Sequence, residues 1–345
     1  MRSPRARRLL GTVERESARA LEHPTYGRAY FDNSVRPEPG SALLSGYDTY
    51  TLEASHARFA AYLAWRFFAP VRTLDVGCAL GYVVAVEREL DIDAQGVDVS
   101  RWAVDHAVPG AAGRLQFANL SSRLPFDDAE FDLVTAFETL EHLPPDDVPH
   151  ALAEIARVSR SYVLATIPSF GPNEYGPGGW LNGKVRWDRL EHYDALGDEY
   201  DGPIPFGDLM RDDTGEPVEG HLTVASFRWW TQRFAAAGLT RVCELERKIH
   251  PEVARFGLTQ GWNLYAFARQ GFAAPAETRS GAEIADVEQR LGIDGCAANP
   301  ADLARVEAAA LGPGPAVRTT GPFKTKDPGD NDLAAARRAG VTLPS

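Results

Sequence analysis

The sequence predicts an α/β fold in which helices cover both faces of a doubly wound, mainly parallel sheet. Short apolar runs alternate with amphipathic segments between residues 73 and 167, and a glycine-containing turn follows the first run. Strands that alternate with helices form βαβ units, which build parallel sheets. The chain has 345 residues, 44% of them hydrophobic and 24% charged, which is enough to bury a full core. Ligands of such folds bind at the carboxyl ends of the strands.

The predicted elements begin with a helix. Apolar side chains at helical spacing (Phe59, Leu63 and Phe67) predict that it covers residues 53–68. Ser100 is placed to cap a later helix that begins directly after it. The other elements in this half are strands at 73–76, 94–98, 115–118, 131–137 and 162–167, a helix after the first strand and a helix at 146–158.

Residues 168–225 interrupt this alternation. They are too long for a plain connection, so we expect a functional insertion that covers the substrate as a lid. A helix at 226–237 and strands at 241–249 and 262–269 then complete the sheet.

The two ends of the chain have different compositions from the middle. Residues 1–52 are expected to form an N-terminal arm and entry loops, and the main domain to span 53–270. Residues 271–345 are rich in Ala, Pro and Gly, with one helix predicted at 282–291 and disorder predicted over 312–345. Such a composition favours a tail that buries too little apolar surface to join the main core.

Composition also excludes several classes of protein. A net charge of −12 argues against a protein that mainly grips phosphate backbones, so no nucleic-acid partner is expected. Cys78, Cys243 and Cys296 form neither a disulfide framework nor a Cys-x-x-Cys zinc motif. The longest apolar stretch, 59–71, is interrupted by Arg66 and is shorter than the roughly 18 residues of a membrane span. We therefore expect a cytoplasmic protein with no membrane partner, and the sequence leaves its oligomeric state open.

The clearest motif is residues 74–82, Leu-Asp-Val-Gly-Cys-Ala-Leu-Gly-Tyr. A buried strand runs into a turn of small residues, which lets backbone N–H groups approach a ligand at the start of a helix. Taken alone, this pattern also fits a strand-to-helix turn without any function.

Three further motifs follow in order. Asp98 ends the second strand, where a carboxylate can accept hydrogen bonds from two ribose hydroxyls. Asn119 and Leu120 follow the third strand. Residues 124–128, Leu-Pro-Phe-Asp-Asp, lead into the fourth strand, which ends in Glu-Thr-Leu-Glu-His at 138–142.

On these four motifs, residues 50–270 resemble the class I S-adenosylmethionine-dependent methyltransferases. The resemblance implies S-adenosyl-L-methionine as the cofactor and a seven-stranded sheet whose last strand is antiparallel. It implies cofactor-binding roles for Asp75, Gly77, Cys78, Ala79 and Gly81 (methionine end), Asp98 and Val99 (ribose), Asn119 and Leu120 (adenine), and Phe137 and Glu138 (below the methyl group).

Two positions depart from the family pattern. Ala79 replaces the middle glycine of the turn, and Asn119 replaces an acid, which leaves a neutral and weaker acceptor for the adenine amino group. A nicotinamide dehydrogenase has the same architecture and is the alternative enzyme class, but it would need glycines at 77, 79 and 82. Ala79 and Tyr82 fail that phosphate-binding pattern.

Glu138, Glu141 and His142 raise the question of a metal, because two carboxylates and an imidazole can hold a divalent ion. Some RNA-terminal methyltransferases are similar here, with a later histidine completing the group, and oxygen-rich Mg²⁺-type ligation would be favoured. The pattern Glu-x-Leu-Glu-His is also widespread in family members where it shapes the pocket. We therefore predict no metal.

The insertion is aromatic and acidic, with twelve Asp or Glu against four Lys or Arg over 168–225. Aromatic rings beside carboxylates suit a polyhydroxylated or neutral organic acceptor. Alternatively, the rings form a small core of the insertion itself. They are Phe170, Tyr175, Trp180, Trp187, Tyr193, Tyr200 and Phe206.

The predicted reaction is transfer of a methyl group to an oxygen of a small molecule, such as a sugar or another hydroxylated metabolite, with nitrogen or carbon as secondary alternatives. His142 is the first candidate for a general base and His221 the second, because histidine titrates nearest neutral pH. Two other functions remain open: a non-catalytic protein that keeps the fold to bind a partner, and a metal-assisted RNA 2′-O-methyltransferase.

Overall fold

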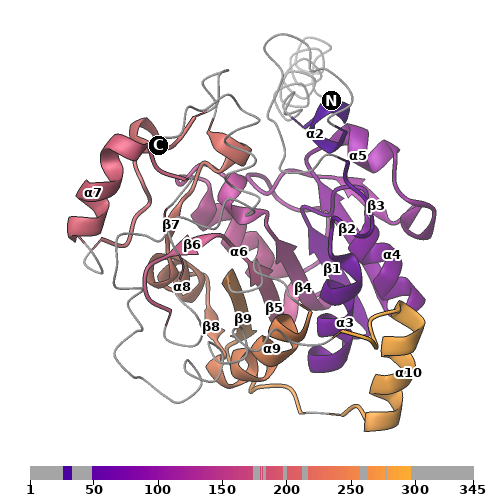
Figure 1. The fold of residues 1–345 in the computed structure, drawn as a ribbon. Helices are drawn as coiled ribbons and strands as arrows, with labels where there is room; N and C mark the ends of the chain where they lie inside the picture. The colour runs from indigo at the N-terminus through magenta and orange to yellow at the C-terminus, as the bar shows by residue number, and fades with distance from the viewer. Residues whose placement is uncertain are drawn as a thin grey trace, which may run out of the picture.

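The computed structural model describes residues 26–32, 49–173, 179, 181, 184–196, 200–211, 217–256, 263–276 and 278–296. Seven strands form one sheet in the order β3-β2-β1-β4-β5-β9-β8 (Figure 1). The strands are β1 (Arg72–Val76), β2 (Asp93–Asp98), β3 (Leu115–Phe117), β4 (Phe131–Phe137), β5 (Ser159–Thr166), β8 (Leu239–Arg241) and β9 (Leu264–Arg269).

The strand directions confirm the predicted fold class. Strands β1 to β5 are parallel to one another, whereas β9 is antiparallel to both β5 and β8. The order reverses between β1 and β4, so the carboxyl ends of these two strands mark the switch point at which α/β sheets bind ligands.

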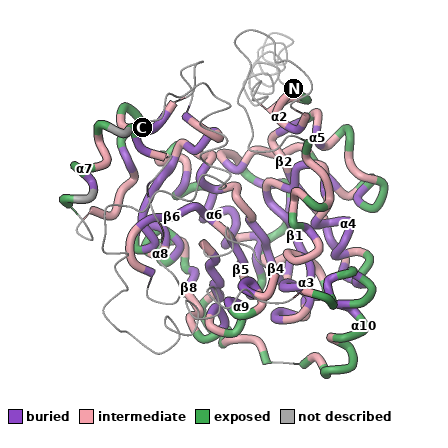
Figure 2. Tube along the Cα trace, viewed as in Figure 1, coloured by how far each residue is buried: buried purple, intermediate pink, exposed green. Residues whose placement is uncertain are grey.

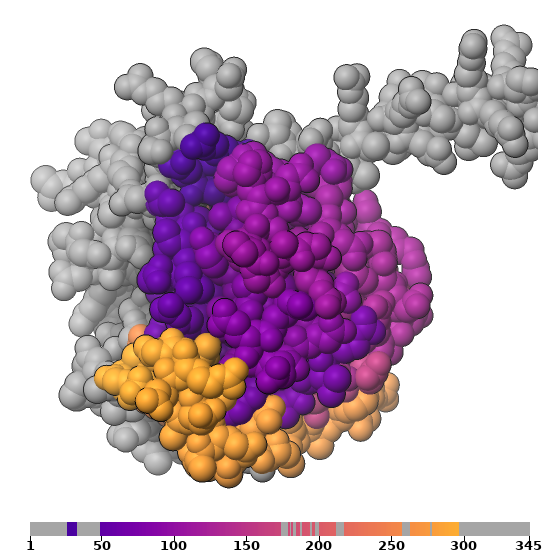
Figure 3. Space-filling model, turned by 90° about the vertical axis from the view of Figure 1, so that its right-hand side faces the viewer, coloured from indigo at the N-terminus to yellow at the C-terminus, as the bar shows by residue number. Residues whose placement is uncertain are grey.

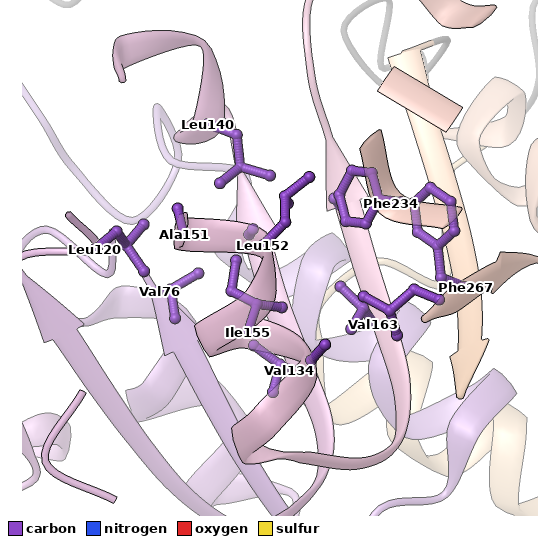
Figure 4. Packing of buried hydrophobic residues seen from close by; sticks show 14 of the residues in the cluster. Val76, Leu120, Val134, Leu140, Ala151, Leu152, Ile155, Val163, Phe234 and Phe267 are labelled. Carbon is purple, nitrogen blue, oxygen red and sulfur yellow. The ribbon is translucent and has the colours of Figure 1, made fainter. Parts of the chain in front are cut away.

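Helices cover both faces of the sheet, whose strands are mostly buried (Figure 2). Along β5 the side chains alternate: Val163 and Ala165 pack against one layer, and Leu164 packs against the other. Figure 4 shows the first layer, in which helix α6 packs on the strands through Leu152 and Ile155. The first layer contains α6 (Val148–Val158) and α8 (Phe227–Ala236), and the second contains α3 (Ala57–Phe68), α4 (Tyr82–Glu89), α9 (Cys243–Arg255) and α10 (Gly281–Leu291).

The strand predicted at 241–249 is wrong. Strand β8 ends at Arg241, and α9 follows from Cys243. Leu245, Ile249 and Val253 are all buried in the second layer, and their four-residue spacing is that of one helix face. Pro251 lies inside this helix, which weakens the helical signal in the sequence.

The expectation that nothing after Gly271 joins the core is also wrong. Helix α10 starts at a capping box in which Ser280 and Glu283 bind each other's backbone, and it buries Val287 and Leu291 against the second layer. Figure 3 shows this segment, in yellow, lying against the indigo residues of the N-terminal half. The predicted disorder at 312–345 and most of the predicted arm lie outside the described residues.

The insertion has a small core of its own. Strand β6 (Ser169–Phe170) pairs in parallel with β7 (Ala225–Ser226). Helix α7 (Trp187–Leu196) contributes Tyr193 to the same buried cluster as Phe170. Phe170 and Tyr193 are buried in this core, as the second interpretation of the aromatic residues proposed, whereas Phe206 is half exposed. Tyr175, Trp180 and the side chain of Trp187 lie outside the described residues.

Among the helices that the structure describes, none combines the length and the apolar composition that a membrane crossing needs.

Candidate active site

The turn after β1 has a left-handed backbone at three positions. Gly77, Ala79 and Gly81 have φ values of 74°, 49° and 80°. A Cβ atom on Gly77 would lie 2.3 Å from Oγ1 of Thr139, so close packing as well as φ requires glycine there. Ala79 keeps the same conformation with a side chain, at a cost on the order of 1 kcal/mol.

Asp98 lies beside this turn at the end of β2. Its Oδ2 accepts a hydrogen bond of 2.8 Å from the Ala79 amide, and its Oδ1 accepts one of 2.7 Å from the Ser100 amide. Ser100 also caps α5 (Arg101–Asp105), as predicted, because its Oγ accepts from the Ala103 amide. A carboxylate accepts about four hydrogen bonds, so Asp98 is held in place and can still accept from a ligand.

Asp75 lies deeper, at the switch point between β1 and β4. Thr135 donates a hydrogen bond of 2.8 Å to its Oδ1. Burial raises the pKa of Asp75 to about 7, so this carboxyl is partly protonated at neutral pH.

The other predicted cofactor residues differ in what they offer. Oδ1 of Asn119 accepts from the Ser121 amide at 2.8 Å, which fixes the amide in a turn. The side chain of Leu120 points into the core beside Val76 (Figure 4). The side chain of Cys78 packs with Leu115, and burial raises the pKa of its thiol well above the usual range. Val99 and Phe137 are half-buried.

An N-terminal segment that the sequence did not assign to the site covers the glycine turn. Helix α2 (Arg28–Phe31) buries Phe31 against Ala79 and Ala103, and its ring stacks on Trp102 with 5.5 Å between centroids. Figure 1 shows α2 directly beside α5. The cluster of aromatic residues around Phe31 was the available signal, but its partner could not be read from the sequence.

The end of β4 carries the second group of predicted residues. Glu138 has a φ of 49°, a strained conformation for a non-glycine residue, and its amide donates to the Thr166 carbonyl at 2.9 Å. Glu141 is fully buried, and neither of its carboxylate oxygens has a hydrogen-bond partner among the described residues. Burial and the nearby charge of Glu138 raise the pKa of Glu141 well above its usual range.

The returning end of the insertion brings His221 to this group. The Glu141 carbonyl accepts hydrogen bonds of 2.8 Å from the amides of Leu222 and Thr223. Nδ1 of His142 lies 3.2 Å from the Gly220 carbonyl oxygen. The backbone of the insertion is therefore docked along the segment that follows β4.

His221 completes a compact polar cluster. Its ring lies 5.2 Å from that of His142, and its Nε2 lies 3.9 Å from Oε1 of Glu141. Glu141, His142 and His221 each offer one ligand atom within 4.8 Å of the other two. Lys184, which the sequence did not single out, places its Nζ 3.0 Å from Nδ1 of His221.

Comparison with known proteins finds a family match for the part of the chain that contains Glu141 and His142. Residues 73–161 match the model of a family described as a methyltransferase domain. This part of the chain is therefore similar to methyltransferase domains, in agreement with the resemblance that its motifs carry.

Several proteins are similar to this methyltransferase domain. The 27-O-demethylrifamycin SV methyltransferase of Amycolatopsis mediterranei is 32% identical over 133 residues, which cover 35% of this chain and 48% of the relative. The ubiquinone biosynthesis O-methyltransferase of an Azoarcus species is 28% identical over 102 residues, covering 28% of this chain and 44% of the relative. The chain thus spans about half the length of the curated relatives it matches.

Solved structures include CalS10 from Micromonospora echinaspora, an amino pentose methyltransferase solved with S-adenosylmethionine bound. It aligns with a TM-score of 0.39 and 16% identity, over 63% of this chain and 91% of CalS10. A TehB-like methyltransferase from Corynebacterium glutamicum aligns with a TM-score of 0.35 and 18% identity, over 62% of this chain and 87% of that structure.

Burial and nearby charges favour the neutral form of both histidines in the candidate site. Burial lowers the pKa of His142 to about 4, and burial together with the charges of Lys184 and His142 lowers the pKa of His221 well below its usual value. A general base works best with a pKa near the operating pH, so neither histidine is well matched to that predicted role. Neutral imidazoles remain good ligands and hydrogen-bond acceptors.

Proposed function

We propose that the chain is an active methyltransferase that transfers a methyl group to an oxygen of a small hydroxylated molecule. The observation that carries this is the convergence of two different sites at the carboxyl ends of β1, β2 and β4. One site is an open glycine turn beside Asp98, and the other is the buried cluster of Glu141, His142 and His221.

The first site fits the cofactor. Asp98 holds two backbone hydrogen bonds and retains acceptor capacity, which suits the two hydroxyls of a ribose. The turn from Gly77 to Gly81 and Asp75 below it would bind the methionine end. Val99 would lie with Asp98 at the ribose, and Asn119 and the Leu120 backbone at the adenine. The cofactor supplies a methyl group on a sulfonium, which is already activated, so positioning can provide most of the rate.

The second site fits the acceptor. The insertion carries eight more acids than bases, which disfavours a polyanionic substrate such as nucleic acid. Polar side chains at the end of β4, Glu138 and His142, would orient a hydroxyl toward the methyl carbon. The matched relatives whose names specify O-methyl transfer support oxygen as the acceptor atom.

Two measurements test this function. Isothermal titration should show that the full chain binds S-adenosylhomocysteine with a 1:1 stoichiometry. Incubation with S-adenosylmethionine and panels of sugars, phenols and hydroxylated lipid precursors should then release S-adenosylhomocysteine with at least one panel. A folded chain that does not bind S-adenosylhomocysteine would contradict the proposal, and binding without turnover on any panel would favour the non-catalytic alternative.

A further inference from the structure

We propose that Glu141, His142 and His221 bind a divalent transition-metal ion, which in turn holds the acceptor through two adjacent oxygens. The proposal rests on the methyl-transfer function above and assigns to that site a metal and a class of substrate. It replaces the sequence-based expectation that the site contains no metal.

Geometry is the first argument. One ligand atom from each of the three residues lies within 4.8 Å of the other two. Ligand atoms that share one ion at about 2.1 Å lie at most about 4.2 Å apart. Three atoms spread around one ion at that distance lie no more than about 3.6 Å apart, so side-chain movements on the order of 1 Å would complete the site.

The unpaired carboxylate of Glu141 is the second and independent argument. This side chain is fully buried, and neither oxygen accepts a hydrogen bond from the part of the chain that the structure describes. A buried carboxylate without partners is costly, and buried charges are generally paired or coordinate a metal. Oε1 of Glu141 faces His221, at 3.9 Å from Nε2, so a bound cation would satisfy the carboxylate and both rings together.

Backbone hydrogen bonds hold the residues of the cluster in place, as the ligands of metal sites require. When Nδ1 of His142 donates to the Gly220 carbonyl, its Nε2 is left unprotonated and able to bind a metal. The carbonyl of Glu141 is fixed by two amides, and Thr223 donates to the Leu143 carbonyl at 2.6 Å. The ligands therefore come from two segments that are docked on each other.

The donor set indicates which ion binds. The motif of Glu138, Glu141 and His142 alone would favour an oxygen-rich, Mg²⁺-type set. The structure instead groups two imidazoles with one carboxylate. Imidazole ligands favour zinc, iron, cobalt or nickel, and a carboxylate adds manganese, so a first-row transition metal fits this mixed set better than Mg²⁺.

The metal would define the acceptor. Three protein ligands leave at least two coordination positions open on a six-coordinate ion, enough for two adjacent oxygens of a vicinal diol or a catechol. A bound hydroxyl loses its proton to water more readily, because the ion stabilises the oxyanion. That oxygen then forms a bond to the methyl carbon while the carbon–sulfur bond breaks, and the electron pair stays on sulfur in S-adenosylhomocysteine.

Lys184 offers another explanation of how the buried carboxylate of Glu141 is balanced. Its ammonium group lies 3.0 Å from Nδ1 of His221, so it is a cation already present beside the cluster. If Lys184 alone balances Glu141, the site needs no metal. The test must therefore include Lys184→Met.

Metal binding is measured directly on the full chain after treatment with a chelator and desalting. Mn²⁺ is titrated by calorimetry, and Co²⁺ by its visible absorption. We expect one ion per chain, and binding at least about 10-fold weaker in Glu141→Gln and in His221→Ala. Matched controls are Glu191→Gln and His192→Ala, which change exposed residues of α7 and should bind the ion as the wild type does.

Melting temperatures with and without metal provide a second measurement, which remains informative if a variant is less stable than the wild type. Without metal, Glu141→Gln should melt at a higher temperature than the wild type, because it removes an unpaired buried carboxylate. With Mn²⁺, the wild type should gain stability and the variant should not. Wild-type protein that binds neither ion, or variants that bind as well as the wild type, would overturn the proposal. Binding that appears only in Lys184→Met would also overturn it, since Lys184 would then be the native cation.

Two readouts separate this proposal from the proposed function. S-adenosylhomocysteine binding is measured in the same metal-free samples: if it persists while no ion binds, the metal site fails and the methyltransferase assignment stands. If S-adenosylhomocysteine does not bind in either condition, the proposed function fails. With metal, catechol should be methylated in preference to phenol and uridine in preference to 2′-deoxyuridine, and equal turnover within both pairs would contradict chelation of the acceptor.

Discussion

The backbone amide of Ala79 donates a 2.8 Å hydrogen bond to Oδ2 of Asp98, which ties the turn after β1 to the end of β2. The two parts of the candidate cofactor site are therefore fixed relative to each other before any ligand binds. Such preorganisation lowers the entropic cost of binding.

Asp98→Ala should weaken S-adenosylhomocysteine binding by about 10- to 100-fold, because hydrogen bonds to charged groups contribute about 1.5–3 kcal/mol. Titration calorimetry measures the change. Asp105→Ala, at the exposed end of α5, is the matched control and should bind normally. Unchanged affinity in folded Asp98→Ala would place the ribose elsewhere.

Phe31→Ala tests whether α2 forms part of the cofactor site. Its ring is buried against Ala79, so removing it should loosen the turn and weaken S-adenosylhomocysteine binding by roughly 10-fold, or about 1.4 kcal/mol. Arg28→Ala changes an exposed residue of the same helix and serves as the control. Equal affinities in the two variants would make α2 a covering segment without a role in binding.

Glu87→Gln tests a buried acid in the second layer. Glu87 is fully buried on α4 and accepts a hydrogen bond from Thr73, and burial raises its pKa to about 8. The folded state then holds a proton that the unfolded chain releases near pH 4.5. The free energy of unfolding should therefore fall as pH rises from about 4.5 to 8, by at most about 1.4 kcal/mol per pKa unit.

Glutamine cannot ionise, so the variant should be more stable than the wild type at pH 9, and this advantage should shrink toward pH 5. Urea unfolding at both pH values measures the difference. Asp75 titrates over an overlapping window, so the comparison is made between variant and wild type at each pH. Exposed Glu89→Gln on the same helix is the control, and a Glu87→Gln advantage that is independent of pH would contradict the assignment.

Leu291→Ala tests the contribution of α10 to the core. Leu291 is 5% exposed and packs in the second layer, so truncation should lower the free energy of unfolding by about 2–4 kcal/mol. Gln289→Ala on the exposed face should change it by less than about 0.5 kcal/mol. If both variants unfold at the same urea concentration, α10 is attached only loosely.

The sequence predicted the elements whose signals are local. The turn at Gly77, the place of Asp98 at the end of β2 and the cap at Ser100 each depend on neighbours within a few positions, and the structure contains all three. Helix α9 was missed because its regular face, from Leu245 to Val253, is preceded by a strand of only three residues and interrupted by a proline.

The remaining features depend on contacts between distant residues. His142 meets the Gly220 carbonyl across 78 positions, and no local pattern specifies that pairing. Composition similarly suggested a tail outside the core, yet Val287 and Leu291, spaced by four residues, suffice to dock α10. The resemblance to a family could point to His142, but it could not place Lys184 beside His221.

Thr223→Val tests whether the docking of the insertion matters for turnover. Thr223 is fully buried, and its hydroxyl donates a 2.6 Å hydrogen bond to the Leu143 carbonyl, directly after the η2 turn (Leu140–His142). Valine keeps the shape but leaves that carbonyl without this donor, which should cost about 1–3 kcal/mol and loosen the segment that holds His221. Because the cofactor turn lies on other strands, we expect turnover to fall by at least about 10-fold while S-adenosylhomocysteine affinity stays within a few-fold.

Steady-state assays and calorimetry on the same preparation provide both values, with Thr240→Val on β8, remote from the site, as the control. A parallel loss of cofactor affinity would mean that the insertion is part of the cofactor pocket, and unchanged turnover would mean that its docking at this point does not position the acceptor.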